Sequence, residues 1–198
     1  AATIEIGDRS ICMTADAFVV TPLSFPGGSI GSLAVNGTIN DLAVSGARPV
    51  ALLCTLILEA GLAGDILEQE VQAIAEAAKA GGVFIAGGDT KVVEHGKGDG
   101  VFINTTGIGV IPDGIHISGD RARPGDRILL SGSIGDHGVA VMSQRTGIAF
   151  ETAITSDSAA LHDLVAAMIK AVPELRCLRD PTRGGLAATL NEIADQSG

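Results

Sequence analysis

The chain has 198 residues, of which 46% are hydrophobic and 18% are charged, and its formal net charge is −10. This composition excludes a disordered chain and predicts a core of Ala, Val, Ile and Leu, because Trp and Tyr are absent. A negative net charge without a Lys/Arg cluster argues against nucleic-acid binding, since the phosphate backbone attracts basic surfaces. An anionic ligand would therefore need metal ions or backbone amides to hold it.

Hydropathy and cysteine spacing indicate the cellular compartment and the state of the thiols. No apolar run approaches the roughly 20 residues that span a bilayer, and no signal peptide opens the sequence, so we expect a cytoplasmic protein without membrane contact. Cys12, Cys54 and Cys177 are odd in number, widely spaced and lack a CxxC pair. This pattern favours buried, inert thiols over a zinc site or a disulfide framework.

Four apolar runs in the first half have the β-branched composition of buried strands. They cover residues 10–20, 50–59, 83–93 and 101–111. The last two runs flank the polar, glycine-rich turn HGKGDG, which predicts that they pair as a hairpin.

Two helices are predicted between these strands. Residues 29–47 carry apolar and small side chains at helical spacing, and glycine and proline close the segment. The second helix begins near Asp65, which resembles a capping box with Glu68, and it ends at Gly81. Its expected buried positions are Leu67, Val71, Ile74 and Ala78. The first half is therefore expected to be a β-α-β-α-β-β unit.

A polar connector after residue 111 predicts a domain boundary, because linkers are exposed and polar. We expect an N-terminal domain at residues 1–113 and the start of a second, α+β domain at residues 114–198. Short apolar runs at residues 127–131 and 175–178 predict strands in this second part.

Helix signals also occur in the second half. A helix is expected from about Ser156 until Pro173 stops it, because apolar residues recur there at helical spacing. A last helix is expected after the loop RDPTRGG.

Three aspartates stand where an apolar element meets a glycine-rich or polar break: Asp16, Asp41 and Asp89. Buried carboxylates are costly unless they are paired, hydrogen-bonded or bound to metal. If the three converge, they suit Mg²⁺, which takes oxygen ligands and bridges protein carboxylates to phosphates. Taken singly, each is better explained as a helix cap or a solvated turn residue. Lys91 follows Asp89 by two residues and would share its face of a strand.

Two glycine-rich segments, PGGSIG at residues 26–31 and TRGG at residues 182–185, precede predicted helices. Amides at a helix N-terminus can hold phosphate oxygens, and glycine permits close approach. Neither segment matches a Walker A or Rossmann motif, and ordinary loop-to-helix junctions have the same pattern. His137 in GDHG is an acid–base candidate, although a loop histidine is commonly only hydrogen-bonded.

Taken together, six segments resemble the serial motifs of the HypE family of hydrogenase maturation proteins. They are TADAFVVTPLSFPGGSIG (14–31), NDLAVSGARP (40–49), GGDTKVVEHG (87–96), FINTTGIG (102–109), SGSIGDHG (131–138) and LRDPTRGG (178–185). HypE belongs to the superfamily of aminoimidazole ribonucleotide synthetase, selenophosphate synthetase and thiamine-monophosphate kinase. One such motif is weak evidence, whereas six in order are specific.

The resemblance implies an ATP-binding α/β protein whose N-terminal half pairs with its twin, so that two sheets form a barrel in a homodimer. ATP and Mg²⁺ would lie near that interface. Asp16, Asp41 and Asp89 would hold the metal and the phosphates, and Lys91 would lie near the reacting group. The remaining expected nucleotide contacts are Gly27, Gly28, Thr90, Arg183 and Gly184, and His137 is the second catalytic candidate.

The resemblance also implies an activity. HypE receives a carbamoyl group from the carbamoyltransferase HypF on its own C-terminal cysteine and uses ATP to dehydrate this S-carboxamide to a thiocyanate. The cyano group then passes through the HypC–HypD complex to the iron of [NiFe]-hydrogenase. The family's closing Pro-Arg-Ile-Cys is not among these residues, so we expect them alone to be inactive. The alternatives are a thiamine-monophosphate kinase or selenophosphate synthetase, and a non-catalytic dimeric scaffold.

Overall fold

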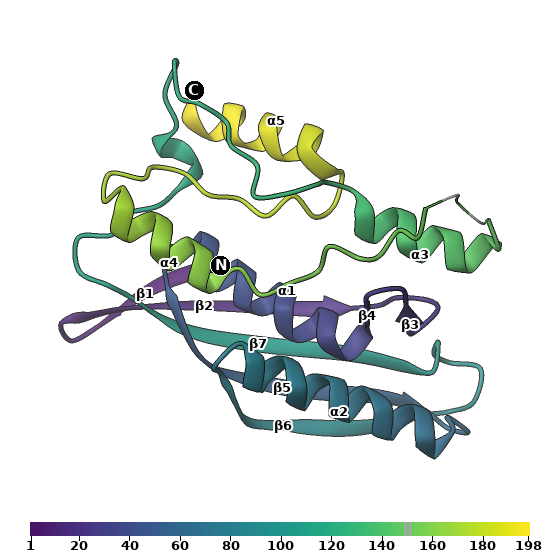
Figure 1. Cartoon of the computed structure of the whole chain (residues 1–198). Coiled ribbons are helices and arrows are strands. Elements are labelled where there is room, and N and C mark those ends of the chain that lie inside the picture. The colour runs from purple at the N-terminus through teal and green to yellow at the C-terminus, as the bar shows by residue number, and fades with distance from the viewer. Residues whose placement is uncertain (149, 151) are drawn as a thin grey trace.

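The computed structural model of the chain describes residues 1–148, 150 and 152–198. Its first half contains a five-stranded sheet in the order β1-β2-β7-β5-β6 (Figure 1). The strands are β1 (Ala2–Ile6), β2 (Arg9–Phe18), β5 (Arg48–Glu59), β6 (Phe84–Val93) and β7 (Val101–Ile111). A small hairpin of β3 (Ser24–Phe25) and β4 (Gly28–Ser29) precedes the first helix.

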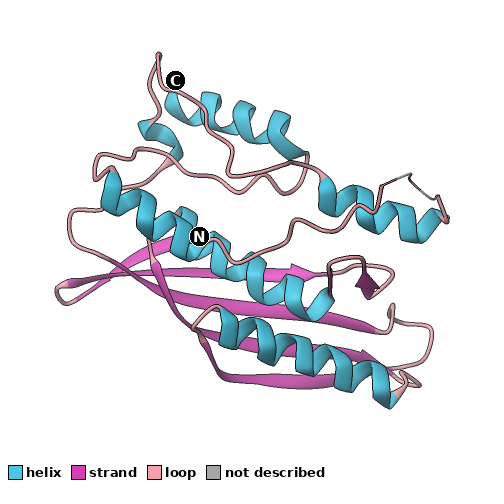
Figure 2. Cartoon of the chain, viewed as in Figure 1, coloured by secondary structure: helices cyan, strands magenta, loops and turns pink. Residues whose placement is uncertain are grey.

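Two helices cover one face of this sheet. α1 (Ile30–Val44) packs on β2, β7 and β5, and α2 (Gly64–Ala80) packs beside α1 towards β6. In Figure 2 the helices lie on one side of the strands. The core between the two layers includes Ile30, Ile39, Leu52, Ile74 and Ile103. The α/β class is confirmed, and the four strands and two helices predicted in this half are present within a few residues.

β7 shows how the sequence selects the covered face. Its odd-numbered residues from Val101 to Gly109 are buried, whereas its even-numbered residues are half-buried. Because side chains alternate along a strand, one face of β7 meets the helices and the other does not. The hydroxyl groups of Thr105 and of Thr38 on α1 lie 2.5 Å apart in this core, so these buried polar atoms are hydrogen-bonded.

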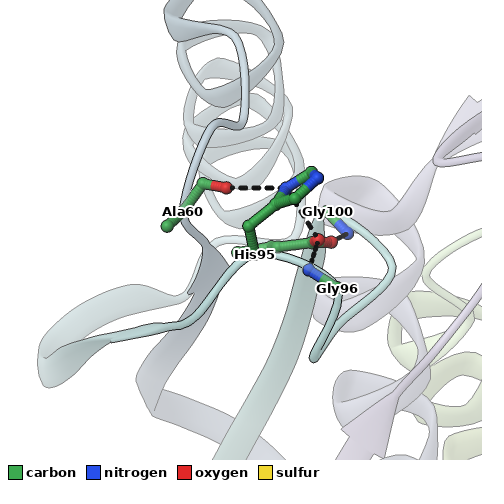
Figure 3. Close-up of polar contacts among 5 residues, drawn as sticks. Ala60, His95, Gly96 and Gly100 are labelled. Atoms are coloured by element: carbon green, nitrogen blue, oxygen red, sulfur yellow. Dashed lines mark hydrogen bonds and ion pairs between the residues drawn. The ribbon is translucent and has the colours of Figure 1, made fainter.

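The predicted hairpin of β6 and β7 is wrong, because β5 lies between them. β5 pairs with β6 in parallel and with β7 antiparallel, which gives this apolar strand a neighbour on each side. The connector from β6 to β7 therefore crosses the end of β5 (Figure 3). The amides of Gly96 and Gly100 donate to the Glu59 carboxylate at 2.5 and 3.1 Å, and His95 Nδ1 lies 3.2 Å from the Ala60 carbonyl oxygen.

Three local details of the first half differ from expectation. β1 was not predicted, and all five of its residues are exposed. The capping box predicted at Asp65 is wrong, because Ala63 is the N-cap and Asp65 lies in the first turn of α2. Val71 is exposed, so α2 buries a narrower face than its apolar pattern predicts.

The second half consists of helices joined by long loops. They are the short 3-10 helix η1 (Gly119–Arg121), α3 (Asp136–Thr146), α4 (His162–Ala171) and α5 (Gly185–Ser197). The strands predicted at residues 127–131 and 175–178 are wrong, since these described residues lie in no strand. A strand needs a hydrogen-bonded neighbour, and here Ile128 and Leu129 are 65% and 83% exposed.

α3 was not predicted, and α4 begins six residues after the predicted start at Ser156. The residues that precede α4 make tertiary contacts instead of helical ones. The Ser156 amide donates to the Pro26 carbonyl at 2.7 Å, and Asp157 accepts from the His137 amide at 3.0 Å. Serine and aspartate compete with helical hydrogen bonding in this way. Across the described ranges, no helix has the length and apolar character to cross a membrane.

Candidate functional site

Two of the predicted aspartates meet between β2 and α1. Thr14 and Asp16 are on the helix-facing side of β2, and Asp41 is near the C-terminal end of α1. The Thr14 hydroxyl donates to Asp41 Oδ2 at 2.9 Å and lies 3.4 Å from Asp16 Oδ2. The strand and helix therefore bring Asp16 and Asp41 together.

A third carboxylate, Asp180, joins them, and sequence reasoning missed it. It lies in the loop RDPTRGG, a few residues before α5. Burial, followed by the charge of Asp41, raises the pKa of Asp180 to about 6. The signal that could have found it is the one used for the others: an aspartate between an apolar run and a glycine-rich break. Asp16, Asp41 and Asp180 are called the carboxylate cluster below.

The electrostatics of the carboxylate cluster are unfavourable without a counter-charge. Burial, and then the charge of Asp41, raises the pKa of Asp16 to about 6. Among the described residues, Arg176 and Arg179 make ion pairs with Asp126 and Glu192, and no Arg or Lys side chain makes one with a member of the cluster. Partly buried like charges of this kind favour proton uptake or a bound cation, and they are common at functional sites.

The cluster suits Mg²⁺ only as part of a shared site. Within the described residues, no group of three or more His, Cys, Asp or Glu side chains is arranged to hold a metal ion alone. Mg²⁺, however, commonly takes one or two protein carboxylates and completes its shell with water and phosphate oxygens. Asp16, Asp41 and Asp180 supply hard oxygen ligands with excess negative charge. These residues therefore fit a metal ion that is shared with an anionic ligand.

Asp89, Thr90 and Lys91 lie away from the cluster. They are on β6, three strands from β2, which corresponds to about 14 Å at the usual strand spacing. Register pairs Asp89 with Thr55 and Lys91 with Ile57, so both project from the face that α1 and α2 leave open. Within one chain, Asp89 therefore does not join Asp16 and Asp41. The roles of Asp89, Thr90 and Lys91 in catalysis and binding stay predictions.

Thr90 lines a cavity of about 540 Å³ between α2 and β6. Its walls are mostly apolar and include Cys54, Val71 and Ile74. Gly88 also lines this cavity, and a Cβ there would lie 1.7 Å from the Cys54 carbonyl oxygen. This glycine is therefore required by the close approach of β5 and β6.

Gly27 lies in the turn of the β3–β4 hairpin, and Gly28 is the first residue of β4. A Cβ on Gly27 would lie 2.8 Å from the Ser156 nitrogen, because the segment before α4 packs directly on this turn. The Cβ of a residue at position 28 would lie 3.2 Å from the Phe25 ring. The structure thus gives both glycines a packing role, and their contact with a nucleotide stays a prediction.

The first amides of α1 already have acceptors. The Ile30 amide donates to the Leu23 carbonyl at 2.8 Å, and the Gly31 amide donates to Glu70 Oε2 at 2.9 Å. Glu70 is only 4% exposed, and its charge lies at the positive end of the α1 dipole. Sequence reasoning missed Glu70, although its position four residues before the apolar Ile74 places it on the buried face of α2.

Arg183 and Gly184 lie at the other glycine-rich junction, immediately before α5. Gly184 has φ +73°, which favours glycine, and Arg183 is exposed. Both follow Asp180 by a few residues. The N-terminus of α5 and the Arg183 guanidinium group therefore lie within a few residues of Asp180 in sequence. Both of these groups are suited to binding a phosphate.

His137 lies in the first turn of α3 and contacts loops. Its Nδ1 is 3.0 Å from the Ser156 hydroxyl, and its ring meets the edge of Phe25 with centroids 5.0 Å apart. Burial lowers the pKa of His137, which favours the neutral ring at pH 7. These contacts join α3 to the β3–β4 hairpin. The catalytic role of His137 stays a prediction.

Two family models match the chain: AIR synthase related protein, N-terminal domain, at residues 1–111, and the C-terminal domain of the same family at residues 123–198. The chain belongs to the AIR synthase-related family. Carbamoyl dehydratase HypE from Azotobacter vinelandii is 63% identical over 197 residues, which are 100% of this chain and 58% of that protein. The resemblance to HypE drawn from the six motifs is thereby confirmed.

Solved structures of this family agree with the comparison. The crystal structure of a HypE–HypF complex has a TM-score of 0.95 and 48% identity, covering 99% of this chain and 64% of that chain. The crystal structure of HypE in complex with ATP has a TM-score of 0.93 and 54% identity, covering 100% of this chain and 58% of that chain. The chain therefore spans less than two thirds of the length of these relatives.

Proposed function

We propose that this chain is the nucleotide-binding part of an ATP-dependent carbamoyl dehydratase that makes the cyanide ligands of [NiFe]-hydrogenase. The carboxylate cluster carries the proposal, in a chain 63% identical to a carbamoyl dehydratase. Asp16, Asp41 and Asp180 hold Mg²⁺, which neutralises phosphate charge. Arg183 and the N-terminus of α5 bind the phosphates. The ATP complex of a similar HypE supports nucleotide binding.

The reaction is a dehydration driven by phosphoryl transfer. The oxygen of an S-carboxamide attacks the γ-phosphorus of ATP, ADP leaves, and the nitrogen loses one proton. The nitrogen then loses its second proton while the C–O bond breaks, so that phosphate leaves and a thiocyanate remains. Positioning and charge neutralisation provide most of the catalysis in such transfers. In this proposal Lys91 lies near the reacting group, and His137 is a candidate to move a proton.

The acceptor thiol is the C-terminal cysteine of the HypE family. Burial raises the pKa of Cys12, Cys54 and Cys177, so the reactive thiolate is disfavoured at each. Cys12 is also completely buried. A form of the protein that ends at Gly198 is therefore expected to produce no cyano group. HypF supplies the carbamoyl group in this proposal, and the solved complex of a similar HypE with HypF supports HypF as a partner. The HypC–HypD complex receives the cyano group.

A homodimer completes the site in this proposal. The sheet face opposite α1 and α2 exposes apolar side chains, and such faces are normally covered. Those on this face are Ile4, Ile6, Leu53 and Phe84. A second copy packed on this face buries them and forms the two-sheet barrel implied by the family resemblance.

The two sheet edges explain how the second copy contributes. Among the described strands, β1 pairs with residues 9–13 of β2 only, so residues 14–18 have an open edge. β6 is the opposite edge of the sheet and is exposed along nearly its whole length. In the register that sets Asp89 of a second copy opposite Asp16, pairing of its β6 with residues 14–18 brings the two backbones about 5 Å apart, one strand spacing. Thr90 and Lys91 follow on the same strand.

The test supplies the full-length protein with HypF, carbamoyl phosphate and Mg·ATP and follows the intact mass. We expect a carbamoyl adduct and then a cyano adduct on wild type and on the exposed control Asp113→Asn. Asp41→Asn is expected to stop at the carbamoyl adduct. Normal cyano formation by Asp41→Asn, or a cyano adduct on a form ending at Gly198, contradicts the proposal.

Two side reactions separate the alternatives. Phosphorylation of thiamine monophosphate or selenide in place of dehydration would identify another enzyme of the superfamily. Nucleotide binding by the full-length protein without any turnover would identify a scaffold.

A further inference from the structure

Asn40 lies immediately before Asp41 on α1, and its side chain holds a distant part of the chain. Its Nδ2 donates to the Ala159 carbonyl oxygen at 2.9 Å, and its Oδ1 accepts from the Leu161 amide at 2.8 Å. The two bonds span 119 and 121 residues of sequence. They are called the Asn40 clasp below.

The chemistry of the Asn40 clasp is specific to an amide side chain. In extended backbone, the carbonyl of one residue and the amide of the residue two further along point to the same side. The carboxamide offers one donor and one acceptor to this pair, as a neighbouring strand would. An aspartate at position 40 would instead place an acceptor against the Ala159 carbonyl. Ala160, between the two clasped residues, packs on the hydrophobic core.

We infer that Asn40 is a positioning residue that holds Asp180 against Asp41 in the carboxylate cluster. The clasped residues lead directly into α4 (His162–Ala171), which packs on α1. Figure 1 shows α4 beside α1, with the chain continuing from α4 towards α5. Asp180 lies on that continuation. The Asn40 clasp thus fixes the start of the segment that carries the third carboxylate.

Among the described residues, the other hydrogen bonds between the halves lie at the opposite end of α1. Arg145 donates to the Thr21 carbonyl through Nε and Nη2 at 2.9 and 2.7 Å, and the Ser156 amide donates to the Pro26 carbonyl. Thr21 and Pro26 precede the first residue of α1, whereas Asn40 is near its last turn. Of these hydrogen bonds, those of the Asn40 clasp therefore lie closest to the cluster along α1.

This inference rests on the proposed function, because it concerns the same Mg·ATP site. The test compares Mg·ATP binding by titration calorimetry at several Mg²⁺ concentrations in wild type, Asn40→Ala, Asn40→Asp and Asn36→Ala. Asn36 is the same residue type one turn earlier on α1 and makes no side-chain hydrogen bond within the described part of the chain. Arg145→Ala, which loosens the other end of α1, is the second control.

We expect Asn40→Ala to raise the Mg²⁺ concentration for half-maximal ATP binding about tenfold, with the same number of nucleotides bound per chain. Hydrogen exchange at the Leu161 amide should become faster in the same variant. Asn40→Asp should be impaired more, because it loses the donor and adds a carboxylate beside the cluster. Asn36→Ala and Arg145→Ala should keep the wild-type Mg²⁺ dependence.

Two results overturn the positioning role. One is an unchanged Mg²⁺ dependence in Asn40→Ala despite faster exchange at Leu161. The other is a lower melting temperature with fewer nucleotides bound at an unchanged Mg²⁺ midpoint, which marks the Asn40 clasp as structural only. Failure of wild type itself to bind Mg·ATP is a different result, since it overturns the proposed function before any variant is compared.

Discussion

The two halves of the chain are held by different kinds of contact. In the first half, five strands pair in long register and two helices bury a continuous core, in which Leu52 and Ile103 are each 1% exposed. In the second half, helices are joined by loops, and apolar residues such as Leu129 remain exposed. The two halves are connected by the packing of α4 on α1 and by single hydrogen-bonding groups, such as the side chains of Asn40 and Arg145.

The carboxylate cluster takes residues from both halves. Asp16 and Asp41 are on a strand and a helix of the first half, and Asp180 is on a loop of the second. This difference indicates that stability depends mainly on the packing of the first half, whereas ligand affinity depends on the junction of the two halves. We expect changes in the first half to alter the free energy of unfolding and changes at the junction to alter ligand binding.

The largest expected effect is on stability and tests the first side of this comparison. Ile103→Ala removes a fully buried side chain between the sheet and α1, which should lower the free energy of unfolding by about 2–5 kcal/mol. Leu129→Ala, in the second half, should change it by about 0.5 kcal/mol or less. Urea unfolding followed by circular dichroism measures both. Equal losses in the two variants would contradict the assignment of stability to the first half.

A smaller effect is expected where a polar group is buried within the first half. Glu70→Ala leaves the Gly31 amide without its acceptor, which should cost about 1–3 kcal/mol. Glu70→Gln keeps an acceptor oxygen and should cost less. Glu68→Ala is the matched control, because Glu68 is exposed on the same helix. The same urea measurement decides, and a loss in Glu68→Ala equal to that in Glu70→Ala would refute the buried-cap interpretation.

The sequence predicts the helices and strands of the first half because their packing repeats along the chain. Alternation through Val101, Ile103 and Thr105 marks β7, and spacing through Ile30, Ala34 and Leu42 marks α1. Strand order is harder to predict, because it depends on which strands hydrogen-bond to the two edges of β5. The turn HGKGDG is compatible with a hairpin, and only the fold shows that it crosses β5 and meets Glu59.

The sequence predicts those residues of the candidate site that a local pattern identifies. Asp16 and Asp41 are charges inside apolar elements, and they meet. Asp89 carries the same mark, but the strand order separates it from them within one chain. Asp180 also has this local pattern, but its contact with Asp41, like the contacts of Asn40, joins the two halves, and no local pattern encodes such a contact.

The smallest expected effect concerns the charge of the carboxylate cluster without metal. Asp41→Asn in EDTA at pH 7 should raise the melting temperature by roughly 1–4 °C, because it removes the charge that disfavours ionised Asp16 and Asp180. Both pKa values, about 6, exceed the value of about 3.9 in an unfolded chain. The folded state therefore binds more protons between about pH 4 and pH 6. Wild-type stability falls as pH rises through that window.

Thermal unfolding across this pH range tests the direction of the predicted change in stability. The gain of Asp41→Asn should be present at pH 7 and should fade below about pH 4, where the carboxyl groups are protonated in both states. Asp113→Asn, an exposed control, should follow wild type. A melting temperature lowered by Asp41→Asn in EDTA at pH 7 would instead identify Asp41 as a structural residue.

The proposed site across two copies is tested most directly by a mixed dimer. One copy carries Asp41→Asn and the other Asp89→Asn, the copies have different tags, and calorimetry measures Mg·ATP bound to the purified mixed dimer. If Asp89 acts on the cluster of the other copy, the mixed dimer retains one intact site and binds one nucleotide with wild-type affinity, whereas dimers of either variant alone bind about tenfold more weakly or worse. A mixed dimer without any site of wild-type affinity would contradict the account.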